Sequence, residues 1–124
     1  MARYRSIQTS FWQDNFIVKL PIIEKAFYNY ILTNNRTTQC GIYNFSLTFS
    51  AVELSISEDE VKVILNKFVD YGKILYDEET EEIMILNWNK YNLNISRNTL
   101  ICVNRELGDI KNRTFIIAIH LQQI

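Results

Sequence analysis

The sequence predicts an α+β domain of the winged-helix class, and three consecutive features between residues 45 and 91 support that prediction. Residues 48–54 form a short apolar segment that we expect to be helical, with a turn at Ser55-Ile56. A longer helix follows, and Gly72 ends it because glycine adopts a left-handed cap without a Cβ clash. Two strand-like runs then form a β-hairpin, called the wing below. A helix–turn–helix followed by such a hairpin is the core of a winged helix.

The longer helix has the clearest local signature. Ser57 is its expected N-cap, and Glu60 completes a capping box three residues later. We expect the wing strands at residues 73–77 and 82–88, which are rich in Ile, Leu and Tyr. Helical spacing predicts that Val61, Ile64, Leu65 and Phe68 are buried and that Glu58, Asp59, Lys62, Asn66 and Asp70 lie on the other side.

The N-terminal 20 residues are expected to form an arm. Ser10 is the predicted N-cap of a brief helix at residues 11–15. Phe11 and Trp12 in that helix are large enough to anchor the arm to a core.

A first long helix is expected to begin at Pro21, where a missing backbone N–H does no harm, and to end at Asn34-Asn35. Residues 41–45 alternate like a strand that pairs with the wing in a small antiparallel sheet. The predicted buried stripe of the helix comprises Ile23, Ala26, Phe27, Tyr30 and Ile31.

The C-terminal third is expected to add a third substantial helix, with Ser96 as its N-cap. The nearly apolar tail at residues 115–121 is compatible with either a helix or a strand. We therefore predict one domain, 1–124, made of an arm (1–20), the helix–turn–helix and wing (21–91) and a C-terminal extension (92–124). The apolar side of the third helix comprises Leu100, Ile101, Val103, Leu107 and Ile110.

The composition indicates a folded protein, since hydrophobic residues make up 48% of the 124 residues. No run reaches the ~18 apolar residues that a membrane-spanning helix needs. No apolar stretch follows the N-terminal arginines as it would in a signal peptide. We therefore expect a cytoplasmic protein, in which Cys40 and Cys102 are buried free thiols.

Catalysis has little support in the sequence. His120 is the single histidine and lies in an apolar run, which favours a structural role. The acidic residues at 77–82 lack the glycine and the ligand spacing of a calcium loop, and a solvated hairpin tip explains them. We expect no enzyme activity, no cofactor and no metal site.

The charge is distributed unevenly along the chain, although the net charge is only −1. Residues 57–82 hold nine acidic residues and three lysines, whereas the segments on either side are both net positive. The acidic block coincides with the second helix of the helix–turn–helix and with the wing. These two elements are the ones that would approach DNA in a winged helix that reads a major groove.

Two interpretations of the helix–turn–helix follow. In the first, its second helix enters a DNA major groove and the wing touches phosphates. In the second, the domain binds proteins, because the acidic first turn (58–60) stabilises the helix dipole but repels phosphates. The DNA-binding candidates are Arg3, Arg5, Lys62, Asn66 and Lys67.

Several short motifs occur in a recognisable order: SFWQD at 10–14, AFYNY at 26–30, GIY at 41–43, LNKF at 65–68, GKILYD at 72–77 and ILNWNKYN at 85–92. Together they resemble the N-terminal domain of phage and prophage replisome organisers, which is similar to DnaD-like primosomal proteins. The resemblance covers most of residues 3–107. It implies a winged-helix domain in replication initiation or helicase loading, with a helicase or its loader as partner. It also implies self-association, with a separate region supplying much of the DNA binding.

The charge pattern independently suggests self-association, because an acidic centre lies between two basic flanks. Apolar surface must then supply the binding energy, since charge sets orientation and rate more than affinity. We expect a homo-oligomer, most simply a dimer, and no membrane association. The candidate interface residues are Phe11, Trp12, Phe16, Phe115, Ile116 and Ile119.

Two other functions remain open at this point. A sequence-specific transcriptional regulator would need a basic recognition surface and a two-fold dimer that matches DNA half-sites. A pure interaction module that targets a replication factor would show no DNA affinity at any salt concentration.

Overall fold

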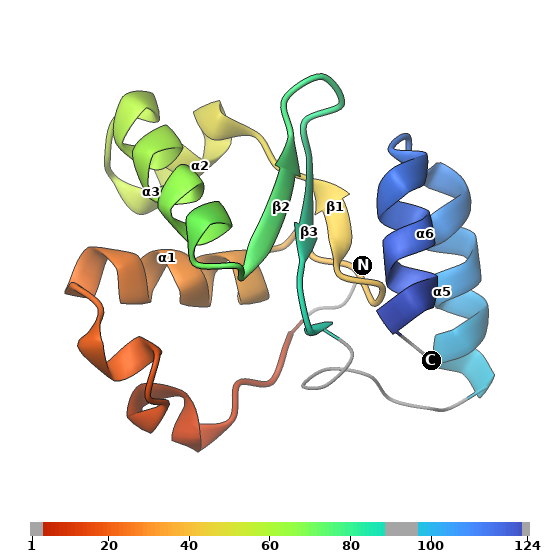
Figure 1. The fold of residues 1–124 in the computed structure, drawn as a ribbon, viewed down its shortest axis with the longest axis horizontal. Helices are drawn as coiled ribbons and strands as arrows, with labels where there is room; N and C mark the ends of the chain where they lie inside the picture. Colours follow the sequence, from red (N-terminus) through yellow and green to blue (C-terminus); the bar gives the residue numbers. More distant parts are fainter. Residues whose placement is uncertain (1–3, 89–96, 123–124) are drawn as a thin grey trace. The chain divides into compact units, whose positions relative to one another are not determined.

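The computed structural model describes residues 4–88 and 97–122, and it describes only the backbone of 97–100 and 119–122. The fold is α+β, with helices around a small three-stranded antiparallel sheet, as predicted. The chain divides into two compact units, residues 1–37 and 38–124, and each is described by itself (Figure 1). The first long helix, which is predicted as part of the segment 21–91, belongs to the first of these two units.

The first unit contains two 3-10 helices, Thr9–Gln13 and Ile17–Lys19, and helix α1, Ile22–Thr33. Pro21 precedes α1 and Asn34 ends it, as expected. The rings of Phe11 and Phe16 each lie 6.0 Å from the ring of Tyr28 on α1, measured between centroids. These contacts anchor the arm to α1.

Two local predictions for the first unit were wrong. The brief helix begins at Thr9, so Ser10 lies inside it instead of capping it. On α1, Ala26 is exposed and Glu24 is buried, although Phe27 and Ile31 are buried as predicted. The hydrophobic pattern located the buried side of α1 correctly, but it could not anticipate a buried carboxylate.

The helix–turn–helix segment consists of α2, Leu47–Leu54, and α3, Glu58–Asp70. The capping box of Ser57 and Glu60 is present, and the four predicted apolar residues of α3 are buried. Gly72, at φ +77°, ends α3, because its N–H and that of Lys73 bond back to the last turn. In the turn between the helices, Ser55 takes a left-handed conformation at φ 59°.

The sheet contains β1 (Ile42–Asn44), β2 (Ile74–Asp77) and β3 (Glu82–Ile85) in the order β1-β3-β2, and both pairs are antiparallel. All four residues of the central strand β3 are buried. The predicted strand at 82–88 was too long, because Leu86 and Asn87 form a turn in which Asn87 has φ 60°. The turn directs the indole of Trp88 inward, where Nε1 donates to the carbonyl oxygen of Gln39 at 2.8 Å.

The C-terminal extension forms a helical pair, α5 (Arg97–Asp109) and α6 (Arg113–Gln122). The tail is therefore helical, which decides between the two alternatives. Figure 1 shows the second unit as three layers, with α2 and α3 on one side of the sheet and α5 and α6 on the other. The core between the sheet and α5–α6 comprises Cys40, Ile42, Met84, Val103, Leu107 and Phe115.

One residue of the predicted apolar side of α5 does not belong to that core. Ile101 is 50% exposed, whereas Val103 and Leu107 are buried and Ile110 is half-buried. The proposed cap Ser96 and the side chain of Leu100 lie outside the described residues. The spacing of the apolar residues therefore predicted α5 but assigned one residue too many to its buried side.

Candidate interaction surface

The exposed side of α3 carries both acidic and basic side chains. Lys62, Asn66 and Lys67 are all exposed, and their spacing places them on the same side of the helix. The first turn places Glu58 and Asp59 in solvent before them. The structure therefore brings together three of the five predicted DNA-binding residues, next to a turn that repels phosphate.

Two of the carboxylates in that turn are fixed by hydrogen bonds. Glu60 accepts from the backbone N–H and the hydroxyl of Ser57, at 3.4 and 3.2 Å. Glu58 Oε1 accepts from Thr48 Oγ1 at 3.0 Å, which ties the first turn of α2 to the first turn of α3. Negative charge at the N-terminus of α3 is thus part of its local structure, where it also complements the helix dipole.

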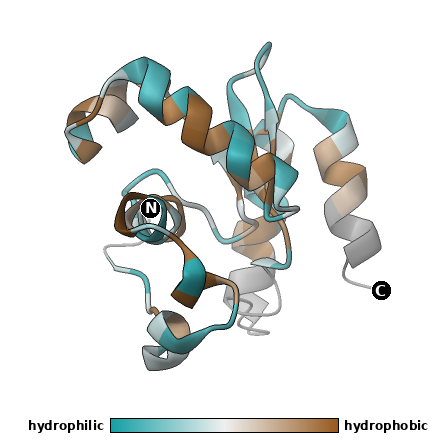
Figure 2. Cartoon of the chain, turned by 60° about the vertical axis from the view of Figure 1, so that its left-hand side comes forward, coloured by the Kyte–Doolittle hydropathy of each residue, from teal (hydrophilic) through white to brown (hydrophobic). Residues whose placement is uncertain are grey.

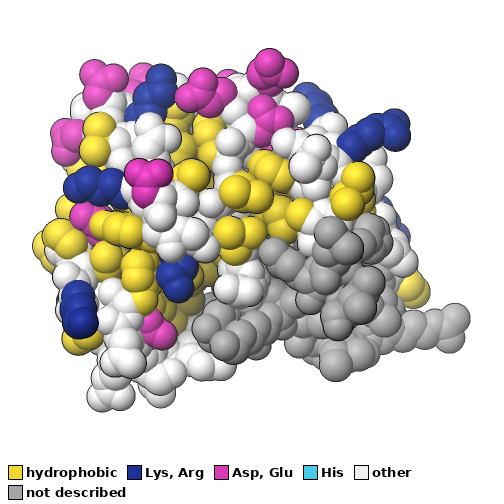
Figure 3. Space-filling view, viewed as in Figure 1, with side chains coloured by type: hydrophobic (Ala, Val, Ile, Leu, Met, Phe, Trp, Pro, Cys, Tyr) yellow, Lys and Arg dark blue, Asp and Glu magenta, His cyan; other side chains and the backbone are white. Residues whose placement is uncertain are grey.

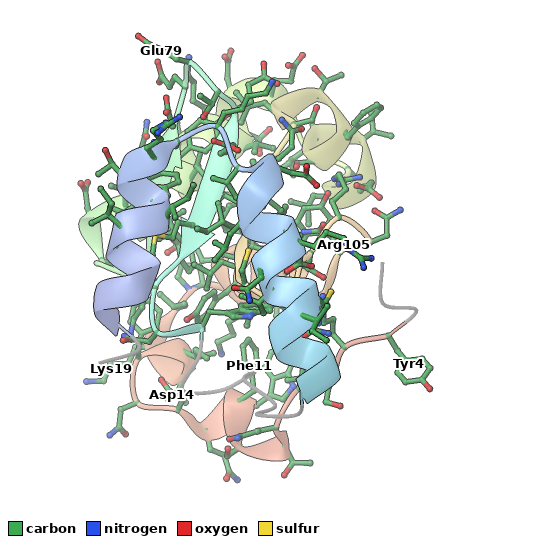
Figure 4. All side chains as sticks on the ribbon, turned by 90° about the vertical axis from the view of Figure 1, so that its right-hand side faces the viewer. Tyr4, Phe11, Asp14, Lys19, Glu79 and Arg105 are labelled. Carbon is green, nitrogen blue, oxygen red and sulfur yellow. The ribbon has the colours of Figure 1, made fainter. Side chains whose placement is uncertain are left out.

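The wing tip adds further acidic residues. Glu78, Glu79 and Glu81 are exposed, and the whole β2–β3 turn is hydrophilic (Figure 2). Figure 4 shows Glu79 at the extreme end of the tip. In Figure 3, acidic side chains line the edge of the molecule above α2, α3 and the wing. The two elements that a winged helix uses on DNA are therefore both acidic here.

The wing is attached to the turn between α5 and α6 close to its tip, at the paired residues Asp77 and Glu82. The carboxylate of Glu82, which is buried, accepts the backbone N–H groups of Lys111 and Asn112 at 2.9 and 2.8 Å. Asn112 Nδ2 donates to Asp77 Oδ2 at 2.8 Å, and Asn112 Oδ1 caps α6 by accepting from the N–H of Phe115. The wing is consequently held against α5–α6 instead of projecting as a free loop.

Hydrogen bonds also lower the pKa of Asp77. Desolvation raises the pKa of its carboxyl, but hydrogen bonds from Glu79, Thr80 and Asn112 together outweigh that effect and lower the pKa below its ordinary value. Sequence reasoning treated residues 77–82 as a solvated cluster and missed the structural roles of Asp77 and Glu82. The sequence feature that could have indicated a buried Glu82 is its place at the start of a strand whose other residues are all apolar.

A second carboxylate fixes α5 to the loop before β1. Glu106 accepts from the backbone N–H groups of Gln39 and Cys40, both at 3.0 Å. Burial raises the pKa of the neighbouring Cys40 thiol. Both cysteines are free thiols, as predicted, but only Cys40 is buried, and Cys102 is half-buried. Glu82 and Glu106 together attach the helical pair to the sheet by four hydrogen bonds to backbone N–H groups.

The two arginines predicted to contact DNA belong to the first unit. Arg3 lies outside the described residues. Arg5 is half-buried, and its guanidinium donates to Thr37 Oγ1 at 2.9 Å and to the Thr37 carbonyl oxygen at 3.2 Å. Two of the guanidinium nitrogens of Arg5 therefore already donate hydrogen bonds to Thr37 within the first unit.

The six candidate interface residues differ widely in exposure. Phe11 and Phe115 are buried, so their side chains contribute little to a free surface. Phe16 and Ile116 are half-buried, Trp12 is 49% exposed, and the side chain of Ile119 lies outside the described residues. Ile117, beside Ile116 on α6, is 60% exposed.

The sequence reasoning did not single out an apolar pair on α2. Phe49 is 61% exposed and Val52 is 74% exposed. The two residues are one helical turn apart and lie on the side of α2 opposite to the buried Ser50 and Ala51. The sequence indicated only that some apolar residues of α2 are exposed, and not which ones, because a helix with apolar residues on every side cannot bury all of them against one neighbour.

Within the described part of the chain, no group of three or more His, Cys, Asp and Glu side chains is arranged to hold a metal ion. Among the same residues, no helix has the length and apolar character needed to cross a bilayer. Comparisons of the chain with protein-family models, with curated proteins and with solved structures found no match.

Proposed function

We propose that this chain is a winged-helix domain that acts as an assembly module in the initiation of DNA replication, in the manner of the replisome organisers that its motifs resemble. In this role it associates with itself and with a helicase or helicase loader, and it contacts DNA only weakly. It performs no chemistry of its own.

The observation that supports the proposal most is the acidic character of both α3 and the wing. Non-specific affinity for DNA depends on cations that neutralise phosphates. A recognition helix normally approaches bases with its N-terminal residues, and here those residues are Glu58, Asp59 and Glu60. The bonds from Thr48 and Ser57 keep two of these carboxylates at that end of the helix.

Exposed apolar side chains near this acidic edge support protein binding. A surface that combines apolar anchors with one sign of charge suits a partner with the opposite charge, since the apolar contact supplies affinity and the charge supplies orientation. Phe49 and Val52 on α2 are such anchors.

The experiment is a direct binding measurement between the purified chain and the purified replicative helicase, helicase loader and initiator encoded by the same genome or its host. We expect one of these proteins to bind at micromolar concentration or tighter. The matched control is a transcription factor from the same source. If none of the replication proteins binds, the replication role is wrong.

A sequence-specific regulator remains the second candidate, because Lys62, Asn66 and Lys67 share one exposed side of α3. Lysine and asparagine are residues that contact guanine and adenine edges. Selection of a preferred duplex from a random-sequence pool would favour this candidate over the assembly module.

A further inference from the structure

We infer that the exposed side of α2 is a docking site for a basic amphipathic helix of a partner protein. This inference deepens the proposed function and rests on it for the identity of the partner, although the docking surface itself is argued from the geometry of α2. We call this docking site the α2 surface, and it consists of Thr48, Phe49, Val52 and Glu53, with Glu58 of α3 beside it.

The eight residues of α2 divide cleanly between two sides. At about 100° per residue, Thr48, Phe49, Val52 and Glu53 fall within an arc of about 140°. All four are exposed, whereas Leu47, Ser50, Ala51 and Leu54 on the opposite arc are buried or half-buried. The α2 surface is therefore one continuous strip of the helix.

Within the strip, the apolar pair lies between two carboxylates. Glu53 lies at one end of the arc, beside Phe49, which is one helical turn earlier. On the other side, Thr48 bonds to Glu58 Oε1 at 3.0 Å, which brings the carboxylate of Glu58 against the first turn of α2. The result is an apolar centre with a negative charge at each margin.

This arrangement determines the chemistry of the occupant. Phe49, Val52 and Glu53 have the i, i+3, i+4 spacing of a ridge that packs into the groove of a second helix. A helix with an apolar stripe would cover Phe49 and Val52. Lys or Arg residues flanking that stripe would then meet Glu53 and Glu58.

A second copy of this chain is a poor occupant. A symmetric dimer formed through the α2 surface would bring the same patch of both subunits together. Glu53 and Glu58 of one subunit would then face the like charges of the other, which is unfavourable. The occupant is therefore a basic segment of a different protein.

The probe is a synthetic amphipathic helix of about 18 residues, or five turns, with Leu on one face and Lys on the other. Two matched peptides replace every Lys with Glu or every Leu with Ser. Binding is measured by fluorescence anisotropy at about 0.15 M salt, and the site is mapped by amide chemical shifts. We expect the Leu/Lys peptide to bind at least about tenfold more tightly than either matched peptide, with shifts concentrated on α2 and the first turn of α3.

Variants of the protein test the location. The double variant F49A/V52A should lose at least about tenfold in affinity for the Leu/Lys peptide, and E53Q/E58Q should reduce the salt dependence of binding. The control I101A/I117A removes two other exposed apolar side chains, on α5 and α6, and should leave affinity within about twofold. All three remove exposed groups, so each should retain the circular dichroism spectrum of the parent chain.

Equal binding of the Lys and Glu peptides, or unchanged affinity of F49A/V52A, would overturn the inference. A change in sedimentation of F49A/V52A would instead identify the α2 surface as a contact between copies of the chain, which also overturns the inference.

The same variants separate this inference from the proposed function. If a replication protein binds wild type and F49A/V52A equally, the replication role stands and the docking site is wrong. If the peptide docks on α2 but no replication protein binds, the docking site stands and the replication role is wrong.

Discussion

The indole of Trp88 lies directly over the backbone of Gly41. A Cβ atom at residue 41 would come within 2.5 Å of Trp88 Cγ, and Gly41 also has φ +81°, which L side chains rarely adopt. Because the Trp88 Nε1–H bonds to the Gln39 carbonyl, the indole cannot easily move away. Residue 41 therefore requires glycine on two independent grounds.

The first prediction is that Gly41→Ala lowers the free energy of unfolding by about 2–4 kcal/mol, from left-handed strain and from overlap with the indole. Gly72→Ala is the matched control. Gly72 has a similar φ of +77°, but an added Cβ there meets nothing within 4 Å, so its cost should be only about 1 kcal/mol. Urea denaturation of both variants measures the difference, and equal losses would show that Trp88 does not restrict residue 41.

The second prediction concerns the attachment of the wing to α5–α6. Glu82→Gln turns one side-chain acceptor into an NH2 group that faces the backbone donors of Lys111 and Asn112. We expect a loss of about 2 kcal/mol, the scale of hydrogen bonds to a charged group, together with faster amide exchange at residues 111 and 112. Glu81→Gln removes a neighbouring exposed charge and should change stability by less than about 0.5 kcal/mol. A loss no larger for residue 82 than for residue 81 would contradict the role of Glu82.

The third prediction is a pH dependence due to Asp77. Its pKa is lowered in the folded state, since hydrogen bonds to the ionised carboxylate outweigh desolvation. Its contribution to stability is therefore complete above the unfolded pKa of about 3.9 and is lost as pH falls through the folded value. The Asp77→Asn variant should be less stable at neutral pH, and its difference from wild type should shrink as the pH falls below about 4. A constant difference across this range would show that Asp77 titrates normally.

The sequence predicted the elements whose signals are local. The Ser57–Glu60 capping box, the apolar spacing of α3 and the glycine that ends α3 all depend on neighbours within a few residues, and all are present. The order of helices and strands from α2 to β3 followed from these signals.

What the sequence could not predict depends on contacts between distant residues. Glu82 and Lys111 are 29 positions apart, and Glu106 and Gln39 are 67 apart. No local pattern indicates that these carboxylates accept backbone N–H groups. Glu82 was predicted to belong to the solvated acidic cluster at 77–82, and no role was predicted for Glu106. The strand at β3 was predicted too long, because the apolar run continues through Leu86 and does not reveal the left-handed conformation of Asn87 that ends the strand.

The candidate site was only partly predictable. The charge pattern identified the acidic block and the exposed side of α3, because net charge by segment needs no structure. The exposed pair on α2 needed the structure, since the sequence does not show which side of a short apolar helix is covered.

The fourth prediction is self-association. Among the described residues, Trp12 in the arm and Ile117 on α6 are exposed apolar side chains towards the two ends of the chain, and exposed apolar side chains of this size commonly mark interfaces. Sedimentation at tens of micromolar should show a dimer or a higher even-numbered assembly. Trp12→Ala or Ile117→Ala should weaken it, while Val63→Ala, another exposed apolar residue, should not. A monomer across this concentration range would rule out a stable homo-oligomer.

The fifth prediction addresses the cause of weak DNA binding. The variant E58Q/D59N/E60Q removes three negative charges from the first turn of α3 but keeps side chains that can still accept hydrogen bonds. If these charges repel phosphates, duplex affinity should rise at low salt. In the opposite direction, K62A/K67A should reduce whatever affinity remains.

The affinity of the unmodified chain for duplex DNA, measured at several salt concentrations, tests the central claim most directly. If the helix–turn–helix and wing bind proteins, DNA affinity should be micromolar or weaker and should fall steeply as salt rises, with no preferred sequence. Tight binding to one sequence that persists at high salt would contradict this account and would identify the chain as a DNA-reading regulator.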